Sequence, residues 1–450
     1  MKPLFVLLSS LLVLFGQLRA ADSGSYFGLP SLKSKATGFF RLAQTHGRHH
    51  LVTPDGHAYL ALGINHLEAL QQSAESGLRV GGDAAWLTFW NQTLRPQFDD
   101  WNLTTLGYGA PAPLKCRAPW FAAIPVAAIE KHRSDPKRDS RDGYHFPDVF
   151  DPAWASDVTG RITKAAAPLR DDPFVIGYFW TDTPTWDLIK TRALRGTEWV
   201  SALRELPTTA PGRQAYATFL ENRYANRLAD LNTIYGLALT ALAQIRDADL
   251  AAIAVGRHVV QEDDDAFLAQ IARRFYDVVG KAQRQADPNH LVFGDRYLAG
   301  DAPGSVLKAA KPWIDAVAVQ PGDRYLPLYP PSTQFPEAEI EVLHTITGKP
   351  VLICDHAISY PTTEQPRTIF EQMPDEASAA KATSDFLQAA FAKPYMLGYL
   401  RCQFIDRPAN YGRGLRQGIV QNDGTPRDNL VRVHREGFAA ALKRLSELAP

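Results

Sequence analysis

Short runs of apolar residues recur along the chain, and each is followed by polar residues and then by a segment with helical periodicity. Runs of this length, rich in β-branched and aromatic residues, are typical of strands, and unbroken ones are typical of strands buried on both faces. Eight such runs are found, at residues 59–64, 104–108, 121–129, 175–180, 291–294, 316–319, 351–354 and 396–402. Strands that alternate with helices favour a parallel sheet. Eight of them predict an α/β protein with a single (β/α)8 TIM barrel.

The connection between the fourth and fifth predicted strands is long. Residues 214–231 and 266–286 have helical periodicity, so we expect a helical insertion after strand four. The acidic run Asp263-Asp264-Asp265 is expected to begin the second helix, because Asp is favoured at helix N-termini. The Pro-rich segment 325–336 is expected to form a loop over the barrel mouth, either lining the substrate site or lying on the surface.

The first residues are typical of a secretory signal peptide. Lys2 precedes an apolar run at residues 4–15, and small residues follow near Ala20. We therefore divide the chain into a signal peptide at residues 1–21 and one domain at residues 22–450, in a secreted or periplasmic protein. An uncleaved anchor is the alternative, although the run is short for a bilayer. No later stretch predicts a membrane span after signal cleavage.

Composition narrows the set of partners. The 48 basic and 48 acidic residues balance, and neither sign is gathered into a tract, so nothing predicts binding to nucleic acid. The three cysteines, Cys116, Cys354 and Cys402, show no zinc-binding spacing. Cys354 and Cys402 fall on strands that are predicted to be neighbours. The sequence leaves open whether they form a disulfide or remain two free thiols. We expect no cofactor and no metal, and the oligomeric state stays open.

In a barrel of this kind the chemistry lies at the C-terminal ends of the strands. Polar residues stand at those ends in this chain, and for each of them a loop cap or a structural ion pair is the alternative to a role in the site. They are Asn65, His66, Asp182, Thr183, Arg296, Gln320, Asp355, His356 and Gln403.

Several segments resemble, in order and spacing, the agarase-type and β-galactosidase-type glycoside hydrolases (families 50 and 42). These segments are residues 62–66 (LGINH), 147–152 (PDVFDP), 175–179 (VIGYF), 219–224 (FLENRY), 286–291 (ADPNHL), 349–353 (KPVLI) and 403–408 (QFIDRP). The resemblance covers nearly all of domain 22–450. It implies a barrel enzyme that cleaves a β-linked, galactan- or agar-like polysaccharide or oligosaccharide.

The chain departs from these families at two positions that matter for catalysis. The families end strand four with Asn-Glu, where this chain has Asp182 and Thr183, and they end strand seven with Glu, where it has Asp355. Glycosidic cleavage needs two carboxyl groups, and a Thr hydroxyl cannot readily replace the acid. We therefore expect Asp182 and Asp355 to be catalytic. Both side chains are one methylene shorter than Glu, which widens the gap between them, and retaining and inverting mechanisms both stay open.

Further residues are expected to bind substrate. Asn65 and His66 suit sugar hydroxyls, and Arg296 suits an anionic sugar or the orientation of Asp355. Arg401 suggests a subsite for a sulfated or uronic-acid sugar, with a salt bridge as the alternative. The remaining candidates are Trp180 and Trp186, which stack on sugars or belong to the core, and Thr183, Gln320, Tyr325, His356 and Gln403.

Two other functions remain open. The missing Asn-Glu pair is also compatible with a catalytically silent barrel that binds carbohydrate. A polysaccharide lyase that uses a Tyr or His base is the third possibility.

Overall fold

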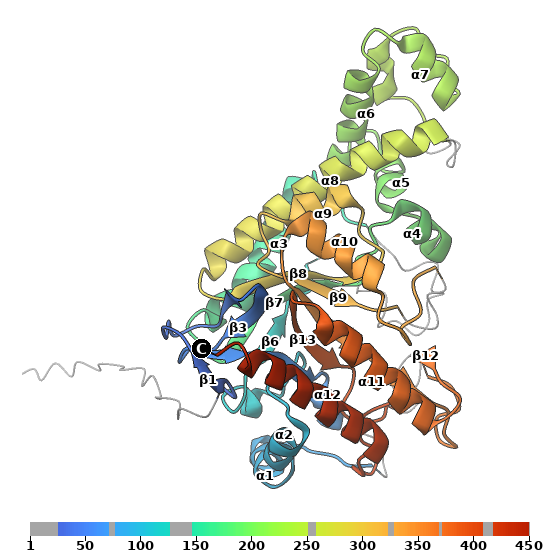
Figure 1. Ribbon diagram of the computed structural model, residues 1–450. Coiled ribbons are helices and arrows are strands. Elements are labelled where there is room, and N and C mark those ends of the chain that lie inside the picture. The colour runs from blue at the N-terminus through green and yellow to red at the C-terminus, as the bar shows by residue number, and fades with distance from the viewer. Residues whose placement is uncertain are drawn as a thin grey trace, which may run out of the picture.

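A computed structural model describes residues 26–71, 77–126, 146–250, 258–322, 328–368, 371–407 and 417–449 (Figure 1). The expected signal peptide at residues 1–21 and the candidate Tyr325 lie outside these described residues.

The centre of the molecule is a curled parallel sheet of seven strands, in the order β5-β13-β10-β9-β8-β7-β6 (Figure 1). Its strands are β5 (Ala61–Ile64), β6 (Trp120–Ala123), β7 (Val175–Asp182), β8 (Leu291–Leu298), β9 (Val317–Gln320), β10 (Val351–His356) and β13 (Met396–Arg401). All neighbouring pairs are parallel, and almost every residue in these strands is buried. The predicted parallel α/β sheet is therefore confirmed, on seven of the eight apolar runs.

The prediction of a second regular strand at residues 104–108 is wrong. Thr105 makes one isolated bridge to Gly63 of β5. The segment nevertheless bonds to both edges of the sheet: Thr104 N–H donates to Leu62 O (2.8 Å), and Phe121 N–H of β6 donates to Gly107 O (2.9 Å). Gly107 has a φ of 64° and Gly109 a φ of 73°, far from extended backbone, so the chain turns away after a single ladder position.

A small antiparallel sheet precedes the central one, in the order β1-β4-β3-β2. Its strands are β1 (Leu29–Lys33), β2 (Arg41–Thr45), β3 (Arg48–Val52) and β4 (His57–Tyr59). The predicted strand at residues 59–64 is therefore divided, since Tyr59 ends β4 of this sheet and Ala61 begins β5 of the central one. A third sheet joins β11 (Ile358–Ser359) and β12 (Glu371–Gln372).

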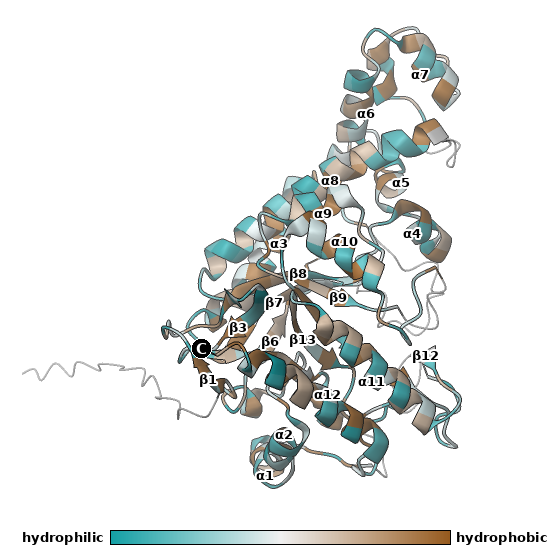
Figure 2. Ribbon diagram, in the orientation of Figure 1, coloured by the Kyte–Doolittle hydropathy of each residue, from teal (hydrophilic) through white to brown (hydrophobic). Residues whose placement is uncertain are grey.

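Helices lie along the outside of the central sheet with apolar faces inward, so that brown strands are surrounded by helices that carry teal residues in Figure 2. The outer helices are α1 (Asp83–Phe89), α2 (Arg95–Trp101), α3 (Pro152–Ala166), α9 (Gly304–Ala310), α10 (Glu337–Thr347), α11 (Glu376–Ala392) and α12 (Asp428–Ser446). The short helical segments are η1 (Leu67–Gln71), η2 (Trp90–Leu94), η3 (Ala112–Leu114), η5 (Ala167–Leu169) and η6 (Leu242–Arg246). No helix in the described part of the chain is long and apolar enough to cross a bilayer.

The long connection between β7 and β8 is helical, as predicted. It contains α4 (Leu188–Arg195), α5 (Trp199–Arg204), α6 (Pro211–Arg223), α7 (Leu228–Tyr235) and α8 (His258–Ala286). Helices α6 and α7 project from the body, and α8 runs back from them to the sheet (Figure 1). The single helix predicted at residues 214–231 is two helices, separated at residues 224–227.

The interpretation of Asp263-Asp264-Asp265 as a helix start is wrong. Helix α8 is already formed at residue 258, so these residues lie inside it. Asp263 accepts hydrogen bonds from the hydroxyls of Tyr224 (2.6 Å) and Tyr235 (2.5 Å), and Asp264 pairs with Arg204 (2.7 Å). Partners on α5 and α7 and directly after α6 thus account for these acidic residues, because both carboxylates are buried and need donors.

No disulfide joins the three cysteines, all of which lie among the described residues. Cys354 lies in β10, Cys402 directly follows the neighbouring β13, and both are buried, whereas Cys116 is exposed. Of the two alternatives for Cys354 and Cys402, the structure excludes the disulfide.

Candidate active site

Polar side chains from four adjacent strands meet at the C-terminal edge of the sheet. Asp182 ends β7, Gln320 ends β9, and Arg296 and Asp355 lie near the ends of β8 and β10. Gln320 Nε2 donates to Asp182 Oδ1 at 2.6 Å. The structure therefore brings together both predicted catalytic carboxylates and two of the predicted binding residues.

Arg296 lies between the two carboxylates. Its Nη2 is 3.4 Å from Asp182 Oδ1, and its Nη1 is 3.8 Å from Asp355 Oδ2. Because one guanidinium contacts both, the two carboxylates are within roughly 10 Å of each other, a range that includes glycosidase acid pairs. Burial lowers the pKa of Arg296, but Asp182 and other nearby acidic groups outweigh it and raise the pKa well above its usual value, so the side chain stays charged.

Asp355 is held by a second group, Tyr108, whose hydroxyl donates to Oδ2 at 2.5 Å. Burial raises the pKa of Tyr108 well above 10, so this hydroxyl keeps its proton. The Arg296 guanidinium lies over the Tyr108 ring, 4.3 Å from its centre. Oδ1 of Asp355 has no hydrogen-bond partner among the described residues. One carboxylate oxygen is thus fixed, while the other is buried without a hydrogen-bond donor.

His66 extends this network toward the surface. Its Nδ1 is 2.8 Å from Glu68 Oε1, and its Nε2 is 3.1 Å from the Tyr108 hydroxyl. Arg407 Nη2 is 3.6 Å from Glu68 Oε1. His66 has a φ of 63°, a backbone conformation that residues other than Gly rarely adopt. Such positions are concentrated at functional sites.

Tyr108 and Arg407 were not among the predicted site residues. The signal for Tyr108 was its position at the end of an expected strand, as for the residues that were chosen. Arg407 comes from a connecting segment, and its sequence position carries no comparable signal.

Two predicted residues, Asn65 and Thr183, form hydrogen bonds to the backbone around the site. Asn65 is fully buried, with Nδ2 donating to Cys354 O (2.8 Å) and Oδ1 accepting from Tyr108 N–H (3.2 Å). Thr183 has a φ of 46°, and its N–H donates to Arg296 O at 3.2 Å. Asn65 therefore fixes the backbone that presents Tyr108, and Thr183 directs the chain away from the end of β7.

Both predicted tryptophans belong to the core, which was the alternative to sugar stacking. Trp186 is fully buried and stacks on Trp199, with ring centres 4.3 Å apart. Trp180 is also buried, and its Nε1 donates to Gln283 of α8 at 3.5 Å. Neither ring presents a face to solvent.

The structure also buries His356, Arg401 and Gln403. His356 bonds to Tyr399 (2.8 Å) and to Ser332 O (2.7 Å), and burial lowers its pKa to about 4. Gln403 Nε2 donates to Ile405 O at 2.5 Å. Arg401 is completely buried, and burial lowers its pKa. The salt bridge that was the alternative to a sugar-binding role for Arg401 is not found among the described residues. These hydrogen bonds of His356 and Gln403 go to residues other than Asp182 and Asp355.

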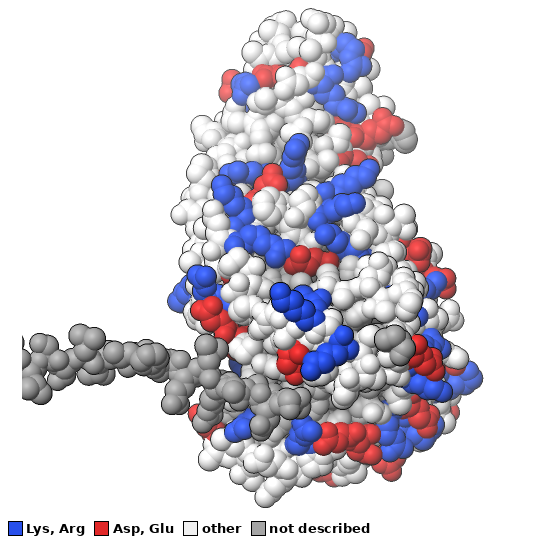
Figure 3. Space-filling model, turned by 60° about the vertical axis from the view of Figure 1, so that its left-hand side comes forward, with Lys and Arg blue, Asp and Glu red and all other residues white. Residues whose placement is uncertain are grey.

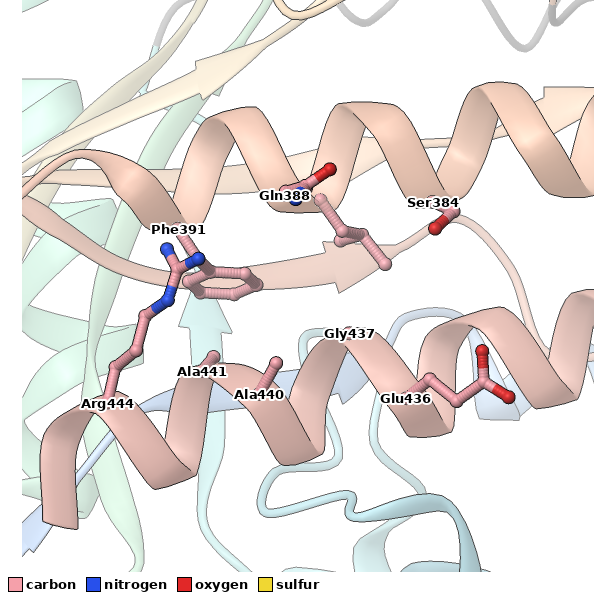
Figure 4. Close-up of a pocket in the computed structure, with 9 residues that line it drawn as sticks. Ser384, Gln388, Phe391, Glu436, Gly437, Ala440, Ala441 and Arg444 are labelled. Carbon is pink, nitrogen blue, oxygen red and sulfur yellow. The ribbon is translucent and has the colours of Figure 1, made fainter. Parts of the chain in front are cut away.

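One groove on the surface lies apart from these residues. A groove on the outer side of the molecule lies between α11 and α12, lined by Phe391, Glu436 and Arg444 among others (Figure 4). It contains none of the predicted site residues. On the face shown in Figure 3, acidic and basic side chains are interspersed, in keeping with the net charge of zero.

One group of described residues has the composition and spacing of metal ligands. Ligand atoms of His66, Asp355 and Cys402 all lie within 4.8 Å of one another.

Two curated proteins have related sequences. The chain is 24% identical over 372 residues to β-agarase A of Vibrio sp. (strain JT0107), covering 77% of this chain and 35% of that protein. It is 20% identical over 351 residues to β-agarase B of the same strain, covering 64% of this chain and 36% of that protein. The chain thus spans about a third of the length of these relatives. No protein-family model matches it.

A solved structure has the same fold. An exo-β-agarase superposes with a TM-score of 0.76 at 20% identity, covering 93% of this chain and 67% of that chain. The resemblance to agarase-type glycoside hydrolases that the sequence indicates is thereby confirmed.

Proposed function

We propose that this protein is a glycoside hydrolase that cleaves a β-linked, agar-like galactan or its oligosaccharides, with Asp182 and Asp355 as the catalytic pair. The two agarase relatives and the exo-β-agarase fold support the substrate class. One observation carries the proposal: two carboxylates from different strands flank a single guanidinium at the C-terminal edge of a parallel sheet.

Asp355 is the group that attacks the anomeric carbon or activates water. Tyr108 and Arg296 both contact its Oδ2, which leaves Oδ1 without a hydrogen-bond partner among the described residues. These two groups stabilise the charge of the carboxylate and fix its direction. Asp182 is the acid that protonates the leaving oxygen, and the Gln320 amide orients it.

We propose that the scaffold is a closed (β/α)8 barrel. Residues 104–107 would take the eighth position, since they bond to both edge strands of the seven-stranded sheet. The N-terminal pattern supports export by a signal peptide at residues 1–21, and thus a secreted or periplasmic enzyme.

The test is release of reducing ends from agarose, agar oligosaccharides and a panel of other plant and marine polysaccharides. We expect cleavage of agar-type substrates. Asp355→Ala should lower turnover by several orders of magnitude, whereas Asp182→Ala should be less damaging for substrates with good leaving groups. Asp157→Ala, an exposed position on α3, is the matched control. Wild-type rates in both site variants would contradict the assignment.

The anomeric form of the first product, read by NMR, decides the mechanism. A retained anomer makes Asp355 a nucleophile, and an inverted one makes it a base.

Binding without cleavage is a second candidate function, favoured by Thr183 at a position where the resembling families have Glu. It would be accepted if agar oligosaccharides bind while no substrate in the panel is cut. A product with new ultraviolet absorbance would instead identify a lyase.

A further inference from the structure

We propose that His66, Asp355 and Cys402 form a binding site for a thiophilic divalent cation, with Zn²⁺ as the preferred ion. The sequence gives no zinc-binding spacing, because the three residues are far apart along the chain. The fold brings them together.

The three ligands come from adjacent strands. His66 follows β5, Cys402 follows β13 and Asp355 lies in β10, and these strands are neighbours in the order β5-β13-β10. Their ligand atoms lie within 4.8 Å of one another. Around a tetrahedral zinc such atoms are roughly 3.3 to 3.6 Å apart, as its bond lengths require. Side-chain adjustments of about 1 Å would close the site.

The imidazole is already prepared as a ligand. Glu68 Oε1 lies 2.8 Å from His66 Nδ1, which donates its proton to that carboxylate, so Nε2 is the ring atom that would bind the ion. Nε2 is 3.1 Å from the Tyr108 hydroxyl, whose own proton goes to Asp355 Oδ2, so a bound ion would replace this hydroxyl as the neighbour of both ligands. A carboxylate behind a histidine in this way is the usual outer support of a zinc ligand.

Asp355 supplies an oxygen that nothing else uses. Its Oδ1 has no hydrogen-bond partner among the described residues. The side chains of His66 and Asp355 keep 17% and 12% of their exposure, whereas Asp355 Oδ1 and Cys402 are buried, so an ion would reach them past His66. Three protein ligands with an open fourth position are typical of zinc sites that accept water or substrate.

The charges around the three ligands are balanced. The carboxylates of Glu68, Asp182 and Asp355 stand against the guanidinium groups of Arg296, Arg407 and the buried Arg401, which directly precedes Cys402. Binding also converts the Cys402 thiol to a thiolate, with its proton released to solvent, which adds one negative charge at the metal. The mixed sulfur, nitrogen and oxygen set suits zinc better than magnesium or calcium.

The test is an anaerobic titration of the full chain with Co²⁺, the spectroscopic substitute for zinc. The reference protein carries Cys116→Ser, because the exposed thiol of Cys116 would bind the ion unspecifically. We expect one ion per chain, a thiolate-to-cobalt charge-transfer band, visible bands of a four-coordinate ion, and loss of all of them when Zn²⁺ is added. No charge-transfer band in the reference protein would overturn the proposal.

Variants identify the ligands. Cys402→Ser should abolish the charge-transfer band and weaken Zn²⁺ binding at least about 100-fold, and Glu68→Gln should weaken it about 10-fold. Cys354→Ser, the other buried thiol, is the matched control and should keep the band. A band that persists in Cys402→Ser would contradict the site.

If Cys402→Ser does not fold, His66→Gln decides, since this side chain is partly exposed. It should keep the charge-transfer band and lose affinity at least about 100-fold, and an unchanged affinity would overturn the proposal.

These readouts do not depend on hydrolysis. Inhibition by Zn²⁺ would follow only if Asp355 is catalytic, and that consequence rests on the proposed function. If the protein binds cobalt but cleaves no sugar, the proposed metal site is supported and the proposed hydrolase function is contradicted.

Discussion

Tyr108 donates a 2.5 Å hydrogen bond to Oδ2 of Asp355, and its ring is covered by the guanidinium that contacts the same oxygen. The direction of this carboxylate is therefore set by one hydrogen bond and one ion pair, from groups outside its own strand. Any reaction of Asp355 with a ligand thus takes place with one of its two carboxylate oxygens, Oδ2, held in position.

Tyr108→Phe should lower kcat about 10- to 100-fold with little change in KM. It removes one hydrogen bond to a charged group, worth roughly 1.5–3 kcal/mol, and keeps the ring under Arg296. The measurement is kcat and KM on an agar oligosaccharide. Tyr395→Phe, whose hydroxyl bonds to Glu341 at 2.8 Å, is the control and should leave both constants unchanged. Equal rates in the two variants would mean that the hydrogen bond does not serve catalysis.

Asp295→Asn should change how stability depends on pH. Burial raises the pKa of Asp295 from 3.8 to about 6, although Tyr276 and the Thr181 N–H oppose the rise. The folded chain thus holds this proton more tightly than the unfolded one. That contribution is complete below pH 3.8 and is lost as the pH rises through about 6.

The asparagine variant stays neutral and avoids this loss. Relative to wild type, its free energy of unfolding should therefore rise by about 2–3 kcal/mol between pH 4 and pH 7. Urea unfolding at several pH values measures it, with Asp157→Asn as the control for losing one carboxylate. A difference that is constant over this range would contradict the prediction.

Trp186→Ala should cost about 3–5 kcal/mol of stability, because it removes a fully buried ring that stacks on Trp199. The affinity of the folded protein for agar oligosaccharides should not change. Thermal unfolding and calorimetric titration give the two quantities, and Trp186→Phe should show a smaller stability loss. If the Trp186→Phe protein is fully stable but binds sugar more weakly, the result would support stacking of Trp186 on sugars.

Gly63→Ala should separate β5 from residues 104–107. A Cβ at this position would lie 2.4 Å from Thr105 O and 2.5 Å from Thr105 Cγ2, so the backbones cannot keep their spacing. We expect a loss of about 3 kcal/mol or more in the free energy of unfolding. Gly160→Ala, in α3 with nothing within 4 Å of the new Cβ, should instead stabilise by roughly 0.5–1 kcal/mol. Similar effects at both positions would show that 104–107 does not press on β5.

The sequence predicted the sheet well, because a strand buried on both faces must be apolar throughout, as β7 and β10 are. The same property limits the prediction of the site. In an unbroken apolar strand nothing shows which polar neighbour points to the mouth, so His356 and Trp180 were predicted to bind substrate beside the catalytic candidates Asp355 and Asp182. The contacts of Asp355 lie with Tyr108 and Arg296, and those of His356 with Tyr399 and Ser332.

Tertiary partners explain the other differences. Asp263 and Asp264 are attractive helix starters when seen in isolation, yet tyrosines and arginines from α5, α6 and α7 account for them. The metal-like group at Cys402 could not be seen for the same reason, because sequence spacing contains no information about which strand ends are neighbours.

Helix α8 has 29 residues and is about 43 Å long at 1.5 Å per residue. Near one end it buries acidic side chains against α5, α6 and α7, and farther along it contacts Trp180 of the sheet. A minimal scaffold trimmed of α4 to α7 would retain this helix and leave Asp263 and Asp264 stripped of their counterions. Engineering a shorter version would therefore require neutral replacements at both positions, made together with the deletion.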